Sequence, residues 1–463
     1  MGDNNKEEIL RLKVAVTDSM QKILTYGGCS EEEIVQCKEI VDAYMKEKDD
    51  EAKKEHRKKL NNLFFNLYKG CVLKSFTNEE EPVPLVVKMF FLHGYLDENL
   101  AGIQNAIILA KATEMYRSSR SGVVSLYEWL YAIYSGQKQP SMNDMSIDYE
   151  QNLREMLKTK EITQGEFDAL SRDRNRKYDY EIANAVSIMK RVSGAPTRFL
   201  APFNEEALEK PLMSAFLENE AVQEELEKIV TVDTNLFCHE YTYVNKEAGL
   251  DNVRITHEIK PDIILLPVIG SRPMMWQEIE GRNRQSASRF FYPKFLNTEL
   301  RDTLVRCCGA YRWEYCKREQ GARWQDISEP SLCSLFYNYI QTYKKNHHIS
   351  QEQKEKITSQ YQKFRHNIKD IFIDDYVKYI NSEAEGHIRL NKLSREILIK
   401  FCILNRDIRA ELVKNGLYTE YINYVNNKLE QQKKLVSNMK KRIEDNGKGI
   451  PVEIREYEDI VNR

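Results

Sequence analysis

Four arginines within twenty residues are the first candidates for chemistry in this chain of 463 residues. Residues 271–290 read SRPMMWQEIEGRNRQSASRF and directly follow the strand-like run PDIILLPVIG. A guanidinium group is planar and binds a phosphate or carboxylate through two parallel hydrogen bonds, and ligand sites often form where a strand ends. The pattern predicts an anion-binding loop over 270–294, with the ligand-binding candidates Arg272, Trp276, Arg282, Arg284 and Arg289.

Two acidic side chains lie in the same loop. Glu278 and Glu280 are the candidates for an acid–base role if the loop belongs to an enzyme, and Trp276 would flank the bound anion. This interpretation requires the side chains to converge on one concave pocket. The alternative is that the arginines form a structural rim on the surface of a core.

A second mixture of cations and aromatic rings follows the loop. Such mixtures suit single-stranded nucleic acid, because every base can stack on an aromatic ring. They equally suit a core that is rimmed by arginines. The net charge of −2 provides no overall attraction to nucleic acid, so RNA or single-stranded DNA binding through 282–324 is the third hypothesis. Its candidate residues are Arg312, Trp313, Tyr315, Arg318, Arg323 and Trp324.

The cysteines and histidines do not predict a metal site. Zinc sites usually draw ligands from close pairs such as C-x2-C, and the nine cysteines are scattered without such a pair. Cys238 and His239 are adjacent on an expected strand, so their side chains point to opposite faces. We predict buried thiols in a reducing compartment, and no metal.

Sequence motifs of common enzymes are also missing from the chain. It contains no G-x-S-x-G, no G-x-x-x-x-G-K-[ST] and no G-x-G-x-x-G, the patterns that position a nucleophile or cradle phosphates. We therefore predict no cofactor and lean away from an enzyme.

The elements that must position these residues are mostly helices. Gly and Pro are few for this length, and apolar residues recur at spacings of three and four. Capping boxes are expected at Ser30 with Glu33 and at Thr163 with Glu166. The predicted fold is mainly α and multi-helical, with one small three-stranded β module mid-chain, made of a hairpin and PDIILLPVIG.

Composition divides the chain into four predicted regions. A helical region over 1–140 and another over 146–230 come first; the latter ends in an acidic helix that either faces water or contacts a basic partner. The β module with the arginine-rich loop spans 235–295, and a helical region spans 296–463. The last region carries a heptad seam for dimerisation, partner binding or packing on its own chain, formed by Ile422, Val425, Leu429, Gln432, Val436, Met439 and Ile443.

Three sequence blocks resemble a known group of proteins. PDIILLPVIGSRPMMWQEIEGRNR, RWEYCKREQGARWQDI and NYIQTYKKN are similar to blocks of large, uncharacterised bacterial proteins, some of them labelled as carrying a cyclic-nucleotide-binding domain. The resemblance covers roughly residues 235–445 and implies a bacterial, intracellular, signalling-related protein. It carries over no functional residue.

These observations favour a cytosolic interaction or regulatory protein that acts through helical surfaces. The N-terminus MGDNNKEEIL lacks the basic start and apolar run of a secretory signal, which predicts a cytoplasmic location. We expect a protein partner or self-association. The alternatives are a binding module for a phosphate or nucleotide ligand, enzymatic or not, and the nucleic-acid hypothesis above.

Overall fold

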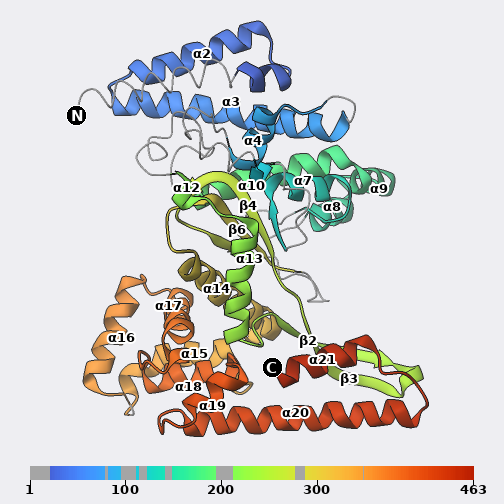
Figure 1. The fold of residues 1–463 in the computed structure, drawn as a ribbon, viewed down its shortest axis with the longest axis vertical. Helices are drawn as coiled ribbons and strands as arrows, with labels where there is room; N and C mark the ends of the chain where they lie inside the picture. Colours follow the sequence, from blue (N-terminus) through green and yellow to red (C-terminus); the bar gives the residue numbers. More distant parts are fainter. Residues whose placement is uncertain are drawn as a thin grey trace. The chain divides into compact units, whose positions relative to one another are not determined.

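The computed structural model describes residues 21–78, 82–94, 111–113, 122–140, 149–193, 212–276, 287–347 and 349–463. The chain is mainly helical there, with a mixed sheet of four strands and a separate two-stranded hairpin, which confirms the predicted fold class (Figure 1). None of the helices in these ranges is both long and apolar enough to cross a membrane. Two units are distinguished: the first contains Met1–Gln223, Asp262–Glu278 and Arg289–Leu300, and the second contains Glu224–Pro261, Ile279–Ser288 and Arg301–Arg463.

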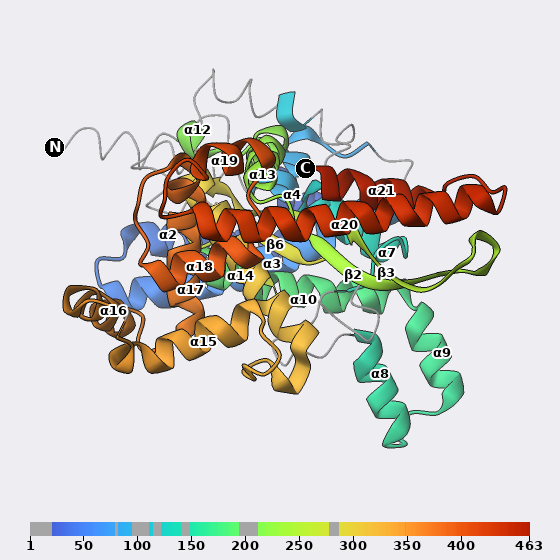
Figure 2. The same ribbon diagram turned by 90° about the horizontal axis from the view of Figure 1, so that it is seen from below.

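The first unit combines the sheet with most of the N-terminal helices. Its helices are α2 (Glu31–Lys46), α3 (Asp50–Thr77), α4 (Leu85–His93), α7 (Leu126–Tyr134), α8 (Tyr149–Lys158), α9 (Gln164–Arg172), α10 (Arg174–Ser193) and α12 (Leu212–Ala215). Helices α8 and α9 lie side by side as a hairpin (Figure 2). Both predicted capping boxes are confirmed, at the start of α2 and of α9.

The sheet of the first unit is mostly parallel. Its strands are β1 (Val123–Ser125), β4 (Asp262–Gly270), β5 (Met274–Trp276) and β6 (Arg289–Leu296), in the order β1-β4-β6-β5. Strand β4 pairs in parallel with β1 and with β6, and only β5 is antiparallel. The expected third strand, PDIILLPVIG, is therefore β4, but it joins this sheet and not the hairpin. Strands β1, β5 and β6 were not predicted from the sequence. The all-buried β6 has no polar alternation that would distinguish it from a helix segment, and β1 and β5 are only three residues long.

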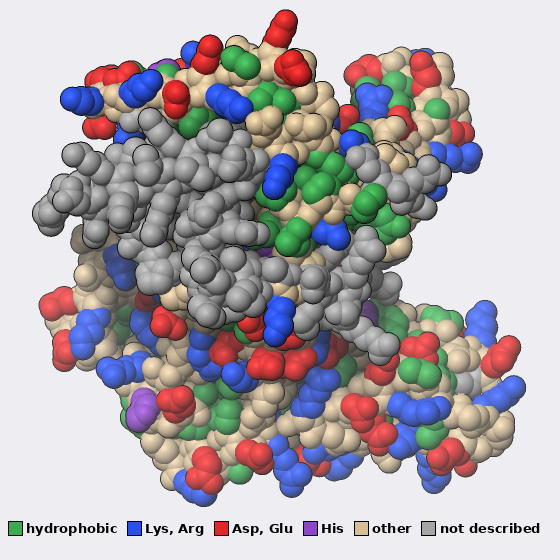
Figure 3. Space-filling model, turned by 45° about the horizontal axis from the view of Figure 1, so that its top comes forward, with side chains coloured by type: hydrophobic (Ala, Val, Ile, Leu, Met, Phe, Trp, Pro, Cys, Tyr) green, Lys and Arg blue, Asp and Glu red, His purple; other side chains and the backbone are tan. Residues whose placement is uncertain are grey.

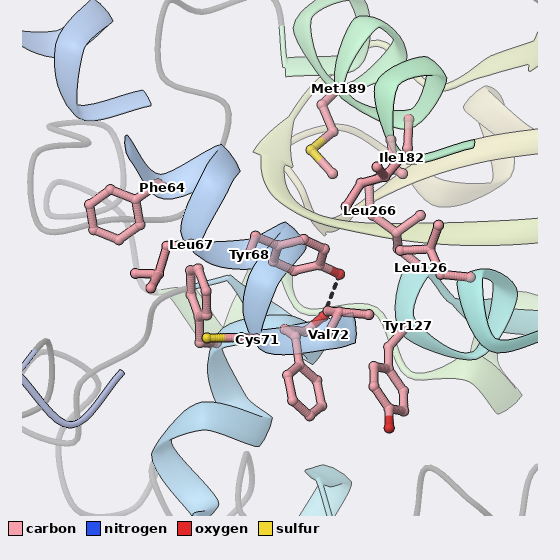
Figure 4. Close-up of a cluster of buried hydrophobic side chains, with 14 of the residues drawn as sticks. Phe64, Leu67, Tyr68, Cys71, Val72, Leu126, Tyr127, Ile182, Met189 and Leu266 are labelled. Carbon is pink, nitrogen blue, oxygen red and sulfur yellow. Dashed lines mark hydrogen bonds between the residues drawn. The ribbon is translucent and has the colours of Figure 1, made fainter. Parts of the chain in front are cut away.

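Three helices that precede strand β4 in the sequence bury it. Contacts with β4 come from α4, α7 and α10, and the shared core contains Leu126 of α7, Met189 of α10 and Leu266 of β4 (Figure 4). In the same cluster, the hydroxyl group of Tyr68 donates to the backbone oxygen of Phe91 at 2.8 Å. Each large apolar side chain buried here stabilises the unit by about 1.5–3 kcal/mol.

Glycine is required at the carboxyl end of β4. A Cβ atom on Gly270 would lie 2.6 Å from the backbone oxygen of Val192 and 2.9 Å from the Cα atom of Ser193. Both neighbours are backbone atoms at the end of α10, so they cannot move aside independently of the helix. The close approach fixes α10 against the end of the strand.

The second unit consists of a hairpin and the C-terminal helices. The hairpin strands are β2 (Cys238–Asn245) and β3 (Leu250–Glu258), and α13 (Asn219–Val232) leads the chain from the first unit into the second. The helices that follow are α14 (Leu300–Gln320), α15 (Leu332–Thr342), α16 (Gln351–Lys363), α17 (Ile368–Asn381), α18 (Lys392–Phe401), α19 (Arg406–Leu412), α20 (Thr419–Asp445) and α21 (Val452–Asn462).

The predicted heptad seam lies on α20 and is buried within its own chain. Six of its seven residues are at most 8% exposed, and only Gln432 is half-buried. Its last three apolar members, Val436, Met439 and Ile443, share a core with Ile255 of the hairpin and Ile454 of α21. Figure 2 shows α20 and α21 side by side, next to β2 and β3. Of the alternatives for the seam, the structure shows packing on the same chain.

Candidate functional site

The structure places only part of the predicted arginine-rich loop. Glu278, Glu280, Arg282 and Arg284 lie outside the described residues. Arg272 is exposed just beyond β4, where its backbone N–H donates to the oxygen of Val192.

Trp276 and Arg289 lie beside each other in the sheet, away from Arg272. Trp276 of β5 is opposite Arg289, the first residue of β6, and both side chains are buried. The Arg289 guanidinium lies 4.5 Å from the centre of the Trp129 ring and donates to the oxygen of Gln139 at 2.9 Å. Arg289 begins β6, whereas Arg272 follows the other end of the parallel strand β4. The described part of the loop therefore does not bring these two arginines together.

The predicted nucleic-acid stretch is partly interior. Trp313 is 3% exposed and Arg312 is 8% exposed. Arg312 forms a two-bond ion pair with the buried carboxylate of Asp233, which also accepts from the hydroxyl of Tyr376 at 2.6 Å. Burial by itself would lower the pKa of Arg312, but the Asp233 carboxylate outweighs it and raises the pKa well above its ordinary value. This arginine is a fixed structural cation and offers no surface for a base or phosphate.

The cysteines are mostly interior, as expected. Seven of the nine are buried and two are half-buried. The neighbouring His239 is also buried, and its Nε2 atom hydrogen-bonds to the hydroxyl of Tyr311 at 2.6 Å.

A buried lysine occupies the carboxyl half of the parallel sheet. Lys294 of β6 is 5% exposed, and it lies where the register between β4 and β6 shifts, between the pairs Leu266–Pro293 and Ile269–Phe295. Its Nζ atom donates to Oδ1 of Asn219 at 3.1 Å and lies 4.7 Å from the centre of the Phe216 ring. The amine is thus held by an amide and an aromatic face.

Two further titratable groups, Glu128 and His93, interact electrostatically with this lysine. Glu128 closes the capping box of α7, where its carboxylate accepts from the backbone and hydroxyl of Ser125 at 2.7 and 2.8 Å. Buried His93 bonds through Nε2 to the Thr113 hydroxyl at 3.0 Å, and its Nδ1 atom has no hydrogen-bond partner within the described ranges.

Burial shifts the pKa of all three groups toward the neutral form. It lowers the pKa of Lys294 from 10.5 to about 8, although Glu128 acts in the opposite direction. It raises the pKa of Glu128, and it lowers that of His93 well below 6.5 with a further contribution from Lys294. Side chains with shifted pKa values often cluster at functional sites, but Lys294 is almost completely enclosed.

The second unit contains an open cleft between α16, α17 and the segment before α18. Its volume is about 580 Å³, within the range of small-ligand sites. Four cations and two carboxylates are among the side chains around it. The lining residues are Gln353, Lys356, Ile357, Ser359, Gln360, Lys363, Asp374, Asp375, Lys378, Ile388, Arg389, Leu390 and Asn391.

The two carboxylates of the cleft already have partners. Lys378 donates to Asp374 at 2.8 Å and to Asp375 at 3.0 Å, and the amide of Gln360 donates to both at 3.0 Å. The hydroxyl of Ser394 also donates to Asp375 at 2.7 Å. Burial alone would raise the pKa of Asp374, but the hydrogen bond from Lys378 and its charge keep that pKa below the ordinary value. Lys378 offsets one of the two negative charges, and the four cations that line the cleft outnumber its two carboxylates.

The remaining cations lie at the water-exposed margin of the cleft. Lys356 pairs with Glu352 at 2.7 Å, and both side chains are about three-quarters exposed, so the pair is weak. Lys363 rests on the ring of Phe364, with 4.9 Å between its Nζ atom and the ring centre. The guanidinium of exposed Arg389 has no hydrogen-bond or ion-pair partner among the residues that the structure describes. These three side chains are available to an anionic ligand.

A buried network fixes the wall that carries Arg389. The backbone N–H groups of Arg389 and Leu390 donate to the carboxylate of Glu383 at 2.6 and 2.7 Å. The same carboxylate accepts from Arg395 and from the hydroxyl of Tyr418, at 2.7 and 2.6 Å. Burial would raise the pKa of Glu383, but the bonds from Arg395 and Tyr418 lower it below 4.5. The charged carboxylate therefore positions one side of the cleft.

The comparisons with known proteins locate this cleft in a recognised segment. Residues 321–459 match the model of a domain of unknown function, DUF8509. No curated protein and no solved structure matches the chain. All the residues that line the cleft fall within this DUF8509 segment.

The cleft was not predicted from the sequence, although the sequence contains one signal for it. Gln353, Lys356, Gln360 and Lys363 follow one another at spacings of three, four and three, which places them on one face of α16. Lys294 carried no comparable signal. An isolated lysine in an aromatic run gives no indication that the side chain is enclosed.

Proposed function

We propose that the chain is a cytosolic bacterial interaction or regulatory protein whose DUF8509 segment binds an acidic segment of a protein partner in the α16–α17 cleft. One observation carries the proposal: Lys356, Lys363 and Arg389 line an open cleft whose two carboxylates are already hydrogen-bonded to Lys378 and Gln360. Ile388, which is 51% exposed beside them, provides an apolar contact for the same partner.

The charge distribution elsewhere supports a local site. On the face drawn in Figure 3, the side chains of Lys and Arg are interspersed with those of Asp and Glu. The chain as a whole carries a net charge of −2. Attraction of an acidic partner must therefore come from a local group of cations, as the cleft provides.

Binding of short fluorescent peptides to the full chain tests this function. Glu-rich and phosphoserine peptides should bind, and a Lys-rich peptide of the same length should not. In the double variant Lys363→Glu/Arg389→Glu the Kd should rise at least ~10-fold, which corresponds to about 1.4 kcal/mol. Binding should also weaken as salt increases.

Lys428→Glu/Lys434→Glu is the matched control. Lys428 and Lys434 are exposed lysines on α20 that do not line the cleft, and this double substitution changes the net charge by the same amount as Lys363→Glu/Arg389→Glu. An equal loss of peptide binding in this control, or no binding of any acidic peptide to the wild type, would reject the cleft as the site.

The volume of the cleft also favours a second candidate, a small phosphate-bearing ligand. Thermal unfolding against nucleotides, cyclic nucleotides and sugar phosphates tests it, because a ligand at a hundredfold excess over its Kd stabilises the native state by about 2.7 kcal/mol. A shift lost in Lys363→Glu/Arg389→Glu places the ligand in the cleft. A shift lost in Arg284→Ala places it in the arginine-rich loop, which stays a prediction.

A further inference from the structure

Two cysteines of the second unit form a close pair that the proposed function does not use. Cys316 lies in the last turns of α14, and Cys333 is the second residue of α15. The backbone N–H of Cys333 donates to Sγ of Cys316 at 3.4 Å, and Sγ of Cys333 donates to the backbone oxygen of Trp313 at 3.2 Å. The two thiols are therefore neighbours, although 17 positions separate them in the sequence.

The surroundings distinguish the two thiols chemically. Hydrogen bonding with the Cys333 side chain, followed by the Cys333 backbone N–H and by Ser331, lowers the pKa of Cys316 from 9.0 to about 7, against the effect of burial. Burial and the bond to Cys316 raise the pKa of Cys333 instead. Cys316 is 9% exposed and Cys333 is fully buried. Cys316 is thus both the more acidic and the more exposed of two adjacent thiols.

The other cysteines provide a contrast. Burial raises the pKa of Cys37, Cys71 and Cys238 to about 12. Cys29 is only half-buried, but burial and Glu33 raise its pKa as well. The thiolate is the reactive form of cysteine. Cys29 is the more exposed of these two cysteines, whereas Cys316 is expected to be the more reactive one.

We propose that Cys316 and Cys333 are a hydroperoxide-reactive dithiol, in which Cys316 is oxidised first and Cys333 then closes a disulfide between α14 and α15. The Cys316 thiolate attacks one peroxide oxygen; an S–O bond forms, the O–O bond breaks, and the departing hydroxide takes up a proton as water. The Cys333 thiol then loses its proton and attacks the Cys316 sulfur. The S–S bond forms, the S–O bond breaks, and a second water leaves.

The balance requires no other reactant. Two thiols and one hydrogen peroxide give one disulfide and two waters, and the two electrons lost by the sulfurs reduce the peroxide. The disulfide would fasten the start of the DUF8509 segment to α14, because residue 321 lies between the two cysteines.

The rate of alkylation of each cysteine in the unmodified full chain gives the first test. At pH 7 about half of Cys316 should be thiolate, against roughly one in a hundred for a thiol whose pKa is 9. Iodoacetamide followed by peptide mass spectrometry should therefore modify Cys316 at least ~10-fold faster than Cys29, with a midpoint near pH 7. A midpoint at or above pH 9, or faster modification of the more exposed Cys29, would overturn the proposal.

Peroxide treatment of three variants gives the second test. In the wild type, stoichiometric hydrogen peroxide should produce a peptide that joins Cys316 to Cys333. Cys333→Ser should instead accumulate a Cys316 sulfenic acid that a cyclic 1,3-dione traps. Cys316→Ser should form neither the disulfide nor the trapped sulfenic acid. Cys29→Ser is the control and should form the disulfide at the rate of the wild type. A wild-type disulfide that joins any other pair, or no trapped adduct in Cys333→Ser, would contradict the assigned order of reaction.

Discussion

Two buried cations, one from each unit of the molecule, behave in opposite ways. Arg312 of the second unit is held by the carboxylate of Asp233, and its pKa is raised. Lys294 of the first unit is held by the amide of Asn219, and its pKa is lowered to about 8. The comparison teaches that burial alone does not decide the direction in which the pKa of a cation shifts. The bonded partner matters as much, because the charge of a carboxylate offsets the lost hydration of the cation and an amide carries no such charge.

The largest expected effect comes from removing the cation of the Arg312–Asp233 ion pair. Arg312→Met leaves the carboxylate of Asp233 buried without its counter-ion, which should lower the free energy of unfolding by about 3–5 kcal/mol. Denaturant titration followed by tryptophan fluorescence measures the loss. Arg301→Met, on the same helix, is the control: Arg301 pairs with Glu225 at 2.8 Å but is 37% exposed, so its loss should be at most about 1 kcal/mol. Equal losses would mean that burial does not separate the two pairs.

The second expected effect is a pH dependence of stability that comes from Lys294, which is bonded to an amide and not to a carboxylate. The pKa of Lys294 is lower in the folded chain than in the unfolded chain, so the unfolded state binds more protons between about pH 8 and 10.5. The stability of the wild type relative to Lys294→Met should therefore rise across this window, by up to about 3 kcal/mol at 1.36 kcal/mol for each pH unit. Thermal melts of both proteins from pH 7 to 10.5 measure it. A constant difference between them would show that Lys294 keeps its ordinary pKa.

A third variant probes the carboxylate of the cleft wall. Glu383→Gln keeps one acceptor oxygen but removes the charge opposite Arg395, which should cost about 1–3 kcal/mol at neutral pH. The folded pKa of Glu383 lies below 4.5, so its stabilisation is complete above pH 4.5 and is lost as the pH falls through the folded value. The stability gap between wild type and variant should close in acid. A gap that does not narrow at all as the pH falls below 4.5 would assign the loss to packing.

The smallest expected effect comes from giving Lys294 a carboxylate partner, as Arg312 has in Asp233. Asn219→Asp places a carboxylate where the amide accepts from the Lys294 amine, so the pKa of Lys294 should move back toward 10.5. The expected gain in stability at pH 7 is about 1 kcal/mol. The midpoint of the pH-dependent stability change described for Lys294 should shift upward in parallel. If the midpoint does not change, the neutral amide of Asn219 is not the reason for the lowered pKa of Lys294.

Local features of the fold could be predicted from the sequence, and pairings over long distances could not. The capping box of Ser30 and Glu33 is complete within four residues, so its pattern was sufficient. The seam on α20 revealed which face is buried but not what covers it, since the covering residues lie in the hairpin and in α21. Strand β6 has its partner β4 twenty-seven residues earlier, in the register Asp262 to Arg289, and no pattern within its eight buried residues specifies that pairing.

The candidate sites divide in the same way. The sequence spacing of Lys356 and Lys363 shows that they share a face of α16. Their position near Arg389 could not be predicted, because it depends on the hydrogen bonds of Glu383. For Arg312, the aromatic and cationic neighbours in the sequence suggested a surface. Its actual partner Asp233 lies 79 positions away, and only the folded chain brings the two together.

The core shared by the hairpin, α20 and α21 has a consequence for synthesis on the ribosome. Ile255 of the hairpin emerges from the exit tunnel long before Val436 and Ile454, which complete its hydrophobic surroundings. At a typical elongation rate of about 5–20 residues per second, roughly ten seconds or more separate the two events. During this interval the hairpin is a nascent two-stranded ribbon with an uncovered apolar face, and such ribbons are marginally stable in water. A chaperone that meets the nascent chain would therefore find its binding surface here.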